Sequence, residues 1–369
     1  SGNSNRQYIT FSSVSQARTC AFRSSKRGMM DSKLTGGHTA SVLCVDVQIQ
    51  TGQVVSGGEG GELCVWSKDG QLIRKLSRPD TDCTSVVFSR ENPNLIYAAF
   101  GEEVLVLDPQ RIQEPVFIFR SNQDEVNQIS LDVKENYLAA CDDAGEIKVF
   151  GLQNRKEFKT LRLKHTNICS TVVFRPSYQW EIVSGGLDCR LVHWDFSKPK
   201  CLNQFNMQEF HATPGDSPYF INPPFVHHLA VSPSGNTFAC ALENGQIPIL
   251  NGSQKNLQPK YALFGHSQGA SQVHFLTDDI LLSAGNDSCI IQWDLAKSEQ
   301  YQPVAIHMNG DGAGSSPEEE KSLAITELCN VRTFAHSNKV NWMAPFCLDA
   351  EKYLYVADQT PDITLLNLS

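Results

Sequence analysis

The sequence predicts an all-β fold, a seven-bladed β-propeller that is closed by a strand from the N-terminal side of its repeats. Three observations predict it. Two segments repeat the same four residue types at matching spacing, five more repeat the same apolar strand pattern, and the repeat length suits a four-stranded unit. Repeats share one continuous core, so 369 residues do not have to divide into several globular domains.

The two clearest repeats run from 164 to 196 and from 265 to 295. Each contains a His, then a Ser ten residues before a Trp and an Asp six residues before it. The two sets are His165, Ser184, Asp188 and Trp194, and His266, Ser283, Asp287 and Trp293. Agreement at four unlike residues is not expected from chance hydrophobic patterning, so these segments indicate a structural repeat.

The other five units keep the strand pattern but lose one or more of these residues. The residues at the Trp position of the seven units are Trp66, Leu107, Phe150, Trp194, Leu250, Trp293 and Leu366. Four of the six gaps between them are 41 to 44 residues, which fits one four-stranded blade of about 40–45 residues. Seven units predict seven blades.

The two longer gaps contain insertions. The first, about 207–224, follows an outer strand and is expected on the top face; it includes Phe210, Tyr219 and Phe220. The second, about 297–329, precedes an outer strand and is expected on the bottom face. Its acidic, low-complexity centre (NGDGAGSSPEEEK) is predicted to be disordered.

The N-terminal segment 1–28 carries five basic residues and no acid, so we expect a disordered basic extension. It also resembles a mitochondrial transit segment, which is the less favoured interpretation. The propeller is expected to occupy 29–369. Because the seventh unit ends after three strands, residues 29–35 are predicted to supply its fourth strand and to close the ring.

The amino-acid composition limits which functions are expected. A formal charge of −9 and a pI near 5.6 argue against general nucleic-acid binding. No apolar run is long enough to span a membrane, and we expect no membrane association. The cysteines stand mostly alone within apolar runs and form no C-x-x-C pair, which is typical of reduced thiols in the cytoplasm or nucleus.

Ser, His and Asp together could suggest a hydrolase. Their recurrence in two units favours a structural explanation, in which the Trp N–H, the Ser hydroxyl, the His and the Asp form a buried hydrogen-bond chain. No G-x-S-x-G elbow or phosphate-binding loop is present, so we predict no catalytic residue, no cofactor and no enzyme activity. A metal at His227, His228 and His211 is disfavoured, because no Cys or carboxylate stands at ligand spacing.

With catalytic and metal sites disfavoured, the remaining candidate for a functional site is the protein surface. Alignment of the units places the start of each inner strand at the central channel and the top face. The aligned pairs are Leu43-Cys44, Thr84-Ser85, Asn127-Gln128, Ser170-Thr171, His227-His228, Ser271-Gln272 and Asn341-Trp342. Among them Asn127, His227, His228, Gln272, Asn341 and Trp342 are the predicted partner surface. Trp342 is either an interface anchor or a core residue that packs beside Met343.

Over residues 30–369 this pattern resembles the WD-repeat propellers. The strings GGH, SGGEGGEL, LKHTNICSTVVFRP, HSNKVNW and YVADQT are similar to WD proteins that associate with the cullin-4 RING ubiquitin ligase through the damage-binding protein 1 adaptor. That resemblance implies a substrate receptor. Many such receptors carry Trp-Asp-x-Arg at the end of a blade; here the nearest match is Leu107-Asp108-Pro109-Gln110-Arg111, so Asp108 and Arg111 are the predicted adaptor contacts.

The sequence therefore predicts a monomeric, non-enzymatic scaffold that presents unknown protein substrates to a cullin-4 ligase. Three alternatives stay open. They are a peptide or histone-tail reader with an acidic channel rim, a structural subunit of another complex, and, least favoured, a propeller hydrolase.

Overall fold

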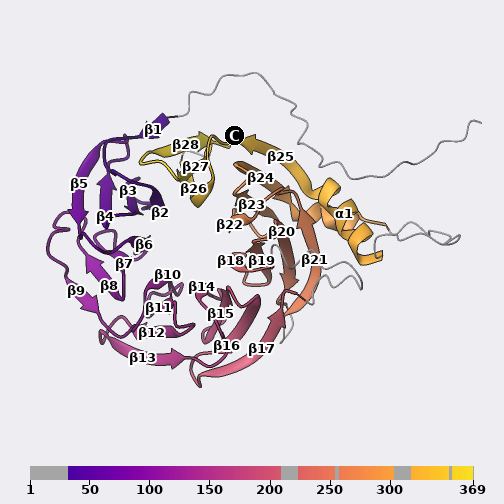
Figure 1. Ribbon diagram of the computed structural model, residues 1–369, viewed down its shortest axis with the longest axis horizontal. Helices are drawn as coiled ribbons and strands as arrows, with labels where there is room; N and C mark the ends of the chain where they lie inside the picture. Colours follow the sequence, from indigo (N-terminus) through magenta and orange to yellow (C-terminus); the bar gives the residue numbers. More distant parts are fainter. Residues whose placement is uncertain (1–31, 209–222, 254–256, 303–316, 349–350, 369) are drawn as a thin grey trace, which may run out of the picture. The chain divides into compact units, whose positions relative to one another are not determined.

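The structure is a computed structural model, which describes residues 32–208, 223–253, 257–302, 317–348 and 351–368. These residues form seven antiparallel sheets of four strands each, arranged around a central axis (Figure 1). The predicted seven-bladed propeller is confirmed.

In each of the first six blades, four consecutive strands run from the centre outward. Blade 1 is β2 Val42–Val47, β3 Val54–Gly58, β4 Glu62–Trp66 and β5 Leu72–Ser77; blade 2 is β6 Cys83–Phe88, β7 Ile96–Phe100, β8 Glu103–Leu107 and β9 Phe117–Phe119. Blade 3 is β10 Val126–Leu131, β11 Tyr137–Asp142, β12 Ile147–Gly151 and β13 Lys156–Leu161; blade 4 is β14 Cys169–Phe174, β15 Glu181–Gly186, β16 Arg190–Asp195 and β17 Lys200–Asn206. Blade 5 is β18 Val226–Val231, β19 Thr237–Leu242, β20 Gln246–Asn251 and β21 Gln258–Phe264; blade 6 is β22 Ala270–Phe275, β23 Ile280–Gly285, β24 Cys289–Asp294 and β25 Asn330–Ala335.

Blade 7 joins strands from both sides of the repeat region. Its order is β26 Val340–Leu348, β27 Glu351–Asp358, β28 Ile363–Asn367 and then β1 Ser32–Leu34, whose residues Ser32 and Leu34 pair with Leu365 and Ile363. The predicted closing strand is therefore present at Ser32–Leu34; residues 29–31 lie outside the described residues.

The core lies between neighbouring blades. The second and third strands are buried along nearly their whole length, because each blade packs on both of its faces. This explains why these strands read as continuous apolar runs. The residues predicted at the Trp position lie at the end of the third strand of each blade, and Trp66, Trp194 and Trp293 are among the largest fully buried side chains.

We define the two faces by the turns they carry. The top face carries the turns between second and third strands and the connections between blades, and the bottom face carries the other two kinds of turn. Of the first insertion, residues 209–222 lie outside the described residues, and with them Phe210, Tyr219 and Phe220.

The second insertion contains two helices, the 3₁₀ helix η3 Leu295–Gln300 and the α-helix α1 Pro317–Cys329. The expectation of disorder is wrong for residues 317–321, which begin α1; residues 303–316 lie outside the described residues. The helix forms because tertiary contacts hold it. It lies outside β21, at the outer edge of the ring (Figure 1), and Ile325 and Cys329 are buried in the blade 5–6 core.

Helix α1 also covers the open edge of β21. The backbone N–H of Phe264 donates to Thr326 Oγ1 at 3.0 Å and that of Ala262 to Ser322 Oγ at 3.5 Å. Two hydroxyls one helical turn apart thus satisfy two edge groups of the strand, where an uncovered edge would offer them to another strand. No helix in the described part of the chain is long and apolar enough to cross a membrane.

Candidate protein-interaction surfaces

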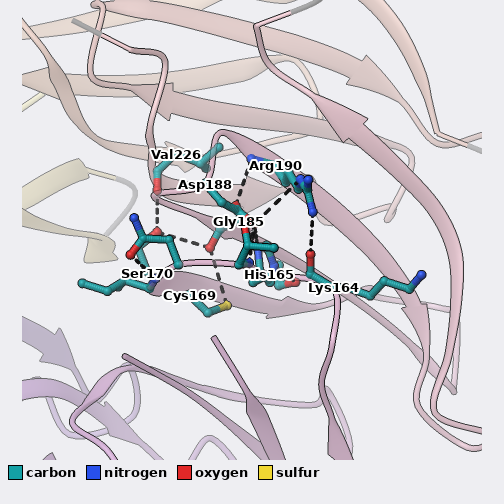
Figure 2. Close-up of polar contacts among 12 residues, drawn as sticks. Lys164, His165, Cys169, Ser170, Gly185, Asp188, Arg190 and Val226 are labelled. Atoms are coloured by element: carbon teal, nitrogen blue, oxygen red, sulfur yellow. Dashed lines mark hydrogen bonds and ion pairs between the residues drawn. The ribbon is translucent and has the colours of Figure 1, made fainter. Parts of the chain in front are cut away.

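The four predicted side chains of blades 4 and 6 come together as hydrogen-bond chains. In blade 4, Trp194 Nε1 donates to Ser184 Oγ at 2.9 Å, and His165 Nε2 lies 2.9 Å from the same oxygen. His165 Nδ1 lies 3.1 Å from Asp188 Oδ1 (Figure 2). Blade 6 repeats this with 2.8, 2.8 and 3.0 Å between the corresponding atoms of Trp293, Ser283, His266 and Asp287. These groups link the strands of each blade and lie inside it.

Each of the two aspartates also fixes the chain that leads into its blade. Asp188 accepts the backbone N–H of Thr166, and Asp287 accepts that of Ser267. Burial, the largest single effect, would raise the pKa of both carboxyls, but the hydrogen bond and charge of His165 or His266 and two backbone N–H groups together outweigh it and hold each pKa below its usual value. Both aspartates are therefore charged anchors for the top-face loops.

Blade 1 has a variant that the sequence interpretation missed. His38 Nε2 lies 2.7 Å from Ser56 Oγ, and Trp66 Nε1 donates to that oxygen at 2.9 Å. The position six residues before Trp66, where the clear repeats have Asp, is Gly60, and the neighbouring Glu59 accepts from Ser41 instead. The carboxylate that holds the incoming chain is Glu62, which accepts the backbone N–H of Thr39 at 2.6 Å. The longer side chain of Glu62 reaches the loop from the start of β4.

Three further blades hold a different polar pair at the same place. Arg78 Nη2 donates to Glu103 in blade 2 at 2.9 Å, Asn122 Nδ2 donates to Asp142 in blade 3 at 2.8 Å, and His336 Nε2 lies 2.7 Å from Asp358 in blade 7. The acid stands four, six or eight residues before the Trp position in different blades. In each case the acid lies in the turn between the second and third strands or at the strand end on either side of it.

The aligned residues at the channel mouth share one backbone feature. Every innermost strand has a register shift at the same place, and one residue of each blade bulges there. The bulged residues are Leu43, Thr84, Asn127, Ser170, His227, Ser271 and Asn341. We call this set the bulge ring.

Side chains of the bulge ring connect successive blades. Thr84 Oγ1 donates to Val126 O at 2.5 Å, Asn127 Nδ2 to Cys169 O at 3.2 Å, and Ser170 Oγ to Val226 O (Figure 2). Ser271 Oγ donates to Val340 O at 2.6 Å, and Asn341 Nδ2 to Val42 O at 3.0 Å. Small polar residues therefore occur here to tie one blade to the next. Leu43 and His227 depart from this pattern.

The bulge ring encloses a hollow of about 430 Å³ at the mouth of the channel, which Gln272 and Trp342 also line. Its rim is acidic: His227 is paired with Glu243 at 2.5 Å, and Asn127 Nδ2 donates to Asp143 at 2.9 Å. Burial raises the pKa of Glu125, and the charges of Asp143, Asp82 and Asp124 raise it further. The mouth combines a polar floor, one indole and negative charge.

One expectation for the channel needs correction. His228 does not lie on the partner surface; it is buried below the mouth, where its Nε2 lies 3.1 Å from Gln128 Nε2 of blade 3. Both alternatives for Trp342 apply in part: it packs against the core and also lines the hollow, while Met343 belongs to the blade 6–7 core. The indole meets His228 edge-to-face with ring centroids 5.3 Å apart, packs against the cores beside blade 1, and remains partly exposed at the mouth.

The Ser, His and Asp side chains of blades 4 and 6 do come together, but Ser184 and Ser283 are fully buried among the described residues. The described part of the chain contains no group of three or more His, Cys, Asp or Glu side chains placed to hold a metal ion. His227 and His228 take different partners on different sides of the strand, because successive residues of a strand face opposite ways. His211 lies outside the described residues.

The predicted adaptor contacts lie on a turn of the bottom face, between β8 and β9. Asp108 Oδ1 accepts the N–H of Gln110 at 2.8 Å, and Asp108 O accepts that of Arg111 at 2.9 Å. Arg111 is exposed, and no ion pair is recorded for it within the described chain. Asp108 thus shapes the turn, and Arg111 is the residue presented to solvent.

The comparisons with known proteins agree with this geometry. Residues 31–67, 156–195 and 257–294 match the model described as WD domain, G-beta repeat. Together with the seven blades and the hydrogen-bond chains, these matches show a seven-bladed β-propeller that is similar to WD-repeat proteins, and such propellers serve as protein-interaction scaffolds.

Among such proteins, the chain is 25% identical to the WD repeat-containing protein 53 homolog of Dictyostelium discoideum, over 92% of this chain and 95% of that protein. The resemblance carried by the five strings is thereby confirmed. The chain is also 22% identical to E3 ubiquitin-protein ligase COP1 and 20% identical to Protein SUPPRESSOR OF PHYA-105 1, both of Arabidopsis thaliana. The matches cover 63% and 82% of this chain but only 32% and 26% of those proteins.

Proposed function

We propose that this chain is a non-enzymatic substrate receptor of a cullin-4 RING ubiquitin ligase, and that it binds the ligase through the damage-binding protein 1 adaptor. The adaptor docks on the bottom face of blades 1 to 3, and protein substrates bind on the top face. The protein acts as a monomeric propeller in the cytoplasm, the nucleus or both. The name of one relative, E3 ubiquitin-protein ligase COP1, supports a ubiquitin link.

The single observation that carries the proposal is the turn that presents Arg111. It follows the third strand of blade 2, where the resemblance places the arginine of the adaptor motif, and two backbone bonds to Asp108 fix its shape. An unpaired guanidinium on a rigid turn loses little conformational entropy on binding and can form a bidentate contact with a carboxylate.

The surroundings of this turn suit a protein partner. Ile49 and Val133, on the bottom-face turns of blades 1 and 3, are 65% and 69% exposed. Between them, Arg90 pairs with Asp46 at 3.0 Å, and its backbone N–H donates to Glu135 of blade 3. Val116, on the same turn as Arg111, is 45% exposed. Blades 1 to 3 thus form a surface with exposed aliphatic side chains and an arginine without an ion pair among the described residues, which are features of a protein interface.

The test is the charge reversal Arg111→Glu. We expect co-purification of the damage-binding protein 1 adaptor and cullin-4 from cells to fall at least tenfold, because the reversal repels the carboxylate that the arginine would contact. The matched control is Arg162→Glu, an exposed arginine on the top face, which should leave co-purification unchanged.

Two outcomes would contradict the proposal. One is recovery of the adaptor at the wild-type level with Arg111→Glu, and the other is absence of both adaptor and cullin-4 from the wild-type purification. Treatment with an inhibitor of cullin neddylation is a second arm, because a ligase substrate should accumulate on the receptor when the ligase is inactive.

A second candidate function is a peptide or histone-tail reader at the channel mouth. The observation that favours it is the acidic rim around a hollow with one partly exposed indole, which suits a cationic side chain. A reader of this kind needs Trp342 and not Arg111. Binding of a lysine- and arginine-rich peptide that Trp342→Ala abolishes and Arg111→Glu leaves intact would favour it. A structural subunit of another complex, the remaining alternative, would show neither peptide binding nor co-purification of the ligase.

A further inference from the structure

One loop of the top face presents an apolar side chain under backbone strain. Leu163 lies between β13 and β14, just before His165 of blade 4, and it is 88% exposed. Its φ of +67° is in the left-handed region, which is unfavourable for a residue with a Cβ. Neither exposure nor strain stabilises the fold.

Blade 1 shows that the fold does not require leucine there. Gly36 stands in the same place, two residues before His38, and has nearly the same φ of +77°. An added Cβ on Gly36 would have no heavy atom within 4 Å, so the position is open to solvent in blade 1. Glycine adopts this backbone without strain, and leucine in blade 4 therefore has another reason to be present.

The Leu163 loop is also held rigidly on both sides. Arg190 Nη1 donates to Lys164 O at 3.0 Å, and His165 is bound into the hydrogen-bond chain of the blade (Figure 2). On the other side, Leu161 is fully buried in the blade 3–4 core. A side chain fixed before binding loses less conformational entropy when a partner covers it.

The charge around Leu163 is opposite to that of the whole protein. The two residues that flank the leucine, Arg162 and Lys164, are both cations, whereas the chain has a formal charge of −9. Neither of them forms an ion pair within the described part of the chain. One apolar side chain thus stands between two unpaired cations.

We propose that Leu163, flanked by Arg162 and Lys164, is a docking knob that inserts into an apolar pocket with an acidic rim on a partner protein. The apolar tip favours protein over nucleic acid, for which phosphate contacts dominate affinity. A single leucine and a net negative protein do not favour a membrane surface. The site lies on the face opposite Arg111, so it does not depend on the adaptor contact.

The experiment is photocrosslinking in cells with the full-length chain. A diazirine analogue of leucine is incorporated at position 163, and in a matched control at position 133, where Val133 is exposed on the bottom face. Mass spectrometry identifies the crosslinked peptide. We expect the product of position 163 to be a protein segment with net negative charge, at least tenfold reduced when Arg162→Glu and Lys164→Glu are combined and unchanged by Arg111→Glu.

A second measurement separates docking from folding. Leu163→Gly should leave the melting temperature unchanged or raise it, because glycine relieves the strain, and should weaken binding to the crosslinked protein at least tenfold, about 1.4 kcal/mol. A fall in melting temperature would make Leu163 a structural residue. Crosslinks to nucleic acid or lipid, equal products at 163 and 133, or no effect of the charge reversals would each overturn the proposal.

Discussion

At the scale of the residue, one task is performed by several chemical pairs. The loop that enters a blade is tied to the region of the turn between its second and third strands by a His–Asp, Arg–Glu or Asn–Asp pair, and in blade 1 by Glu62, which accepts the N–H of Thr39. What these arrangements share is a carboxylate that accepts hydrogen bonds from the incoming chain, and an unpaired carboxylate there would be costly. The chemistry of the acid is retained while its place in the sequence moves.

Blade 1 gives a pH dependence that can be measured. Burial lowers the pKa of His38 to about 4, although the charge of Glu62 opposes this. Between pH 6.5 and 4 the unfolded chain binds a proton at His38 and the folded chain does not, so stability is lost as the pH falls through this window.

We therefore expect His38→Gln to remove about 2 kcal/mol of the loss in unfolding free energy between pH 7 and pH 5. Glutamine does not titrate, and its amide can still donate to Ser56. Denaturant unfolding of wild type and variant at both pH values measures the difference. Parallel losses in the two proteins would show that His38 is protonated in the folded state as readily as in the unfolded chain.

At the scale of the element, the top-face turns depend on left-handed backbone at one position, five residues before the Trp position. Glycine occupies it in blades 1, 3 and 5, as Gly61, Gly145 and Gly245, whereas Cys189 and Ser288 occupy it in blades 4 and 6. At Gly245 a second constraint is added, because a Cβ would lie 2.7 Å from the backbone oxygens of both His266 and Gln268. The turn of blade 5 is in close contact with the chain entering blade 6.

Two alanine substitutions separate strain from close contact. Gly60→Ala, at φ +74° with no neighbour within 4 Å, should cost about 1 kcal/mol for strain alone. Gly245→Ala, at φ +81°, should cost that amount and a further ~1–3 kcal/mol, because backbone atoms must move. Denaturant midpoints compare the two. Equal losses of stability in the two variants would mean that the blade 5 turn can move away from blade 6 without a cost in free energy.

The same elements show where sequence reasoning succeeds. The number of blades follows from the spacing of Trp66, Trp194 and Trp293 and of their apolar substitutes, since every third strand must bury that residue. The aligned residues of the bulge ring were predicted as a set, because the repeat fixes their place. The bulge itself is a backbone property that no residue type marks, and Glu62 escaped notice because it stands two residues beyond the expected register.

Two features could not be predicted from the sequence, for physical reasons. Helix α1 has almost no amphipathic pattern, and its burial depends on Ile325, Cys329 and two hydroxyls that meet β21 in space. The partnership of Gln128 with His228 crosses the channel between blades that lie 100 residues apart in the chain. Contacts of this kind are set by tertiary geometry and leave no local signal.

At the scale of the whole molecule, the ring is a closed set of seven sheets whose last sheet is completed by β1. Leu34 carries this closure, because its side chain is buried with Trp66, Tyr355 and Ile363 in the core between blades 7 and 1. Its neighbour Lys33 is exposed and only 3.9 Å from Asp362, a weak surface pair. Closure therefore depends on one buried side chain and the strand that positions it.

We expect Leu34→Ala to destabilise the protein by about 2–5 kcal/mol, the range for a buried leucine. Lys33→Ala, on the same strand, should change stability by less than about 1 kcal/mol. Deletion of residues 29–35 should lower the melting temperature sharply, because it leaves the edge of β28 open. An unchanged melting temperature after the deletion would show that six complete blades and a three-stranded seventh are self-sufficient.

The pairing of β1 with β28 also has a consequence during synthesis. Ser32 leaves the ribosome long before Leu365, its partner in the sheet. At roughly 5–20 residues per second, β1 waits about 20–70 seconds for that partner. Six blades can complete their sheets in the nascent chain while the first strand is still unpaired. The final folding step is thus linked to translation of β28, and chains truncated before it would expose the edges of blade 7 to chaperones and proteases.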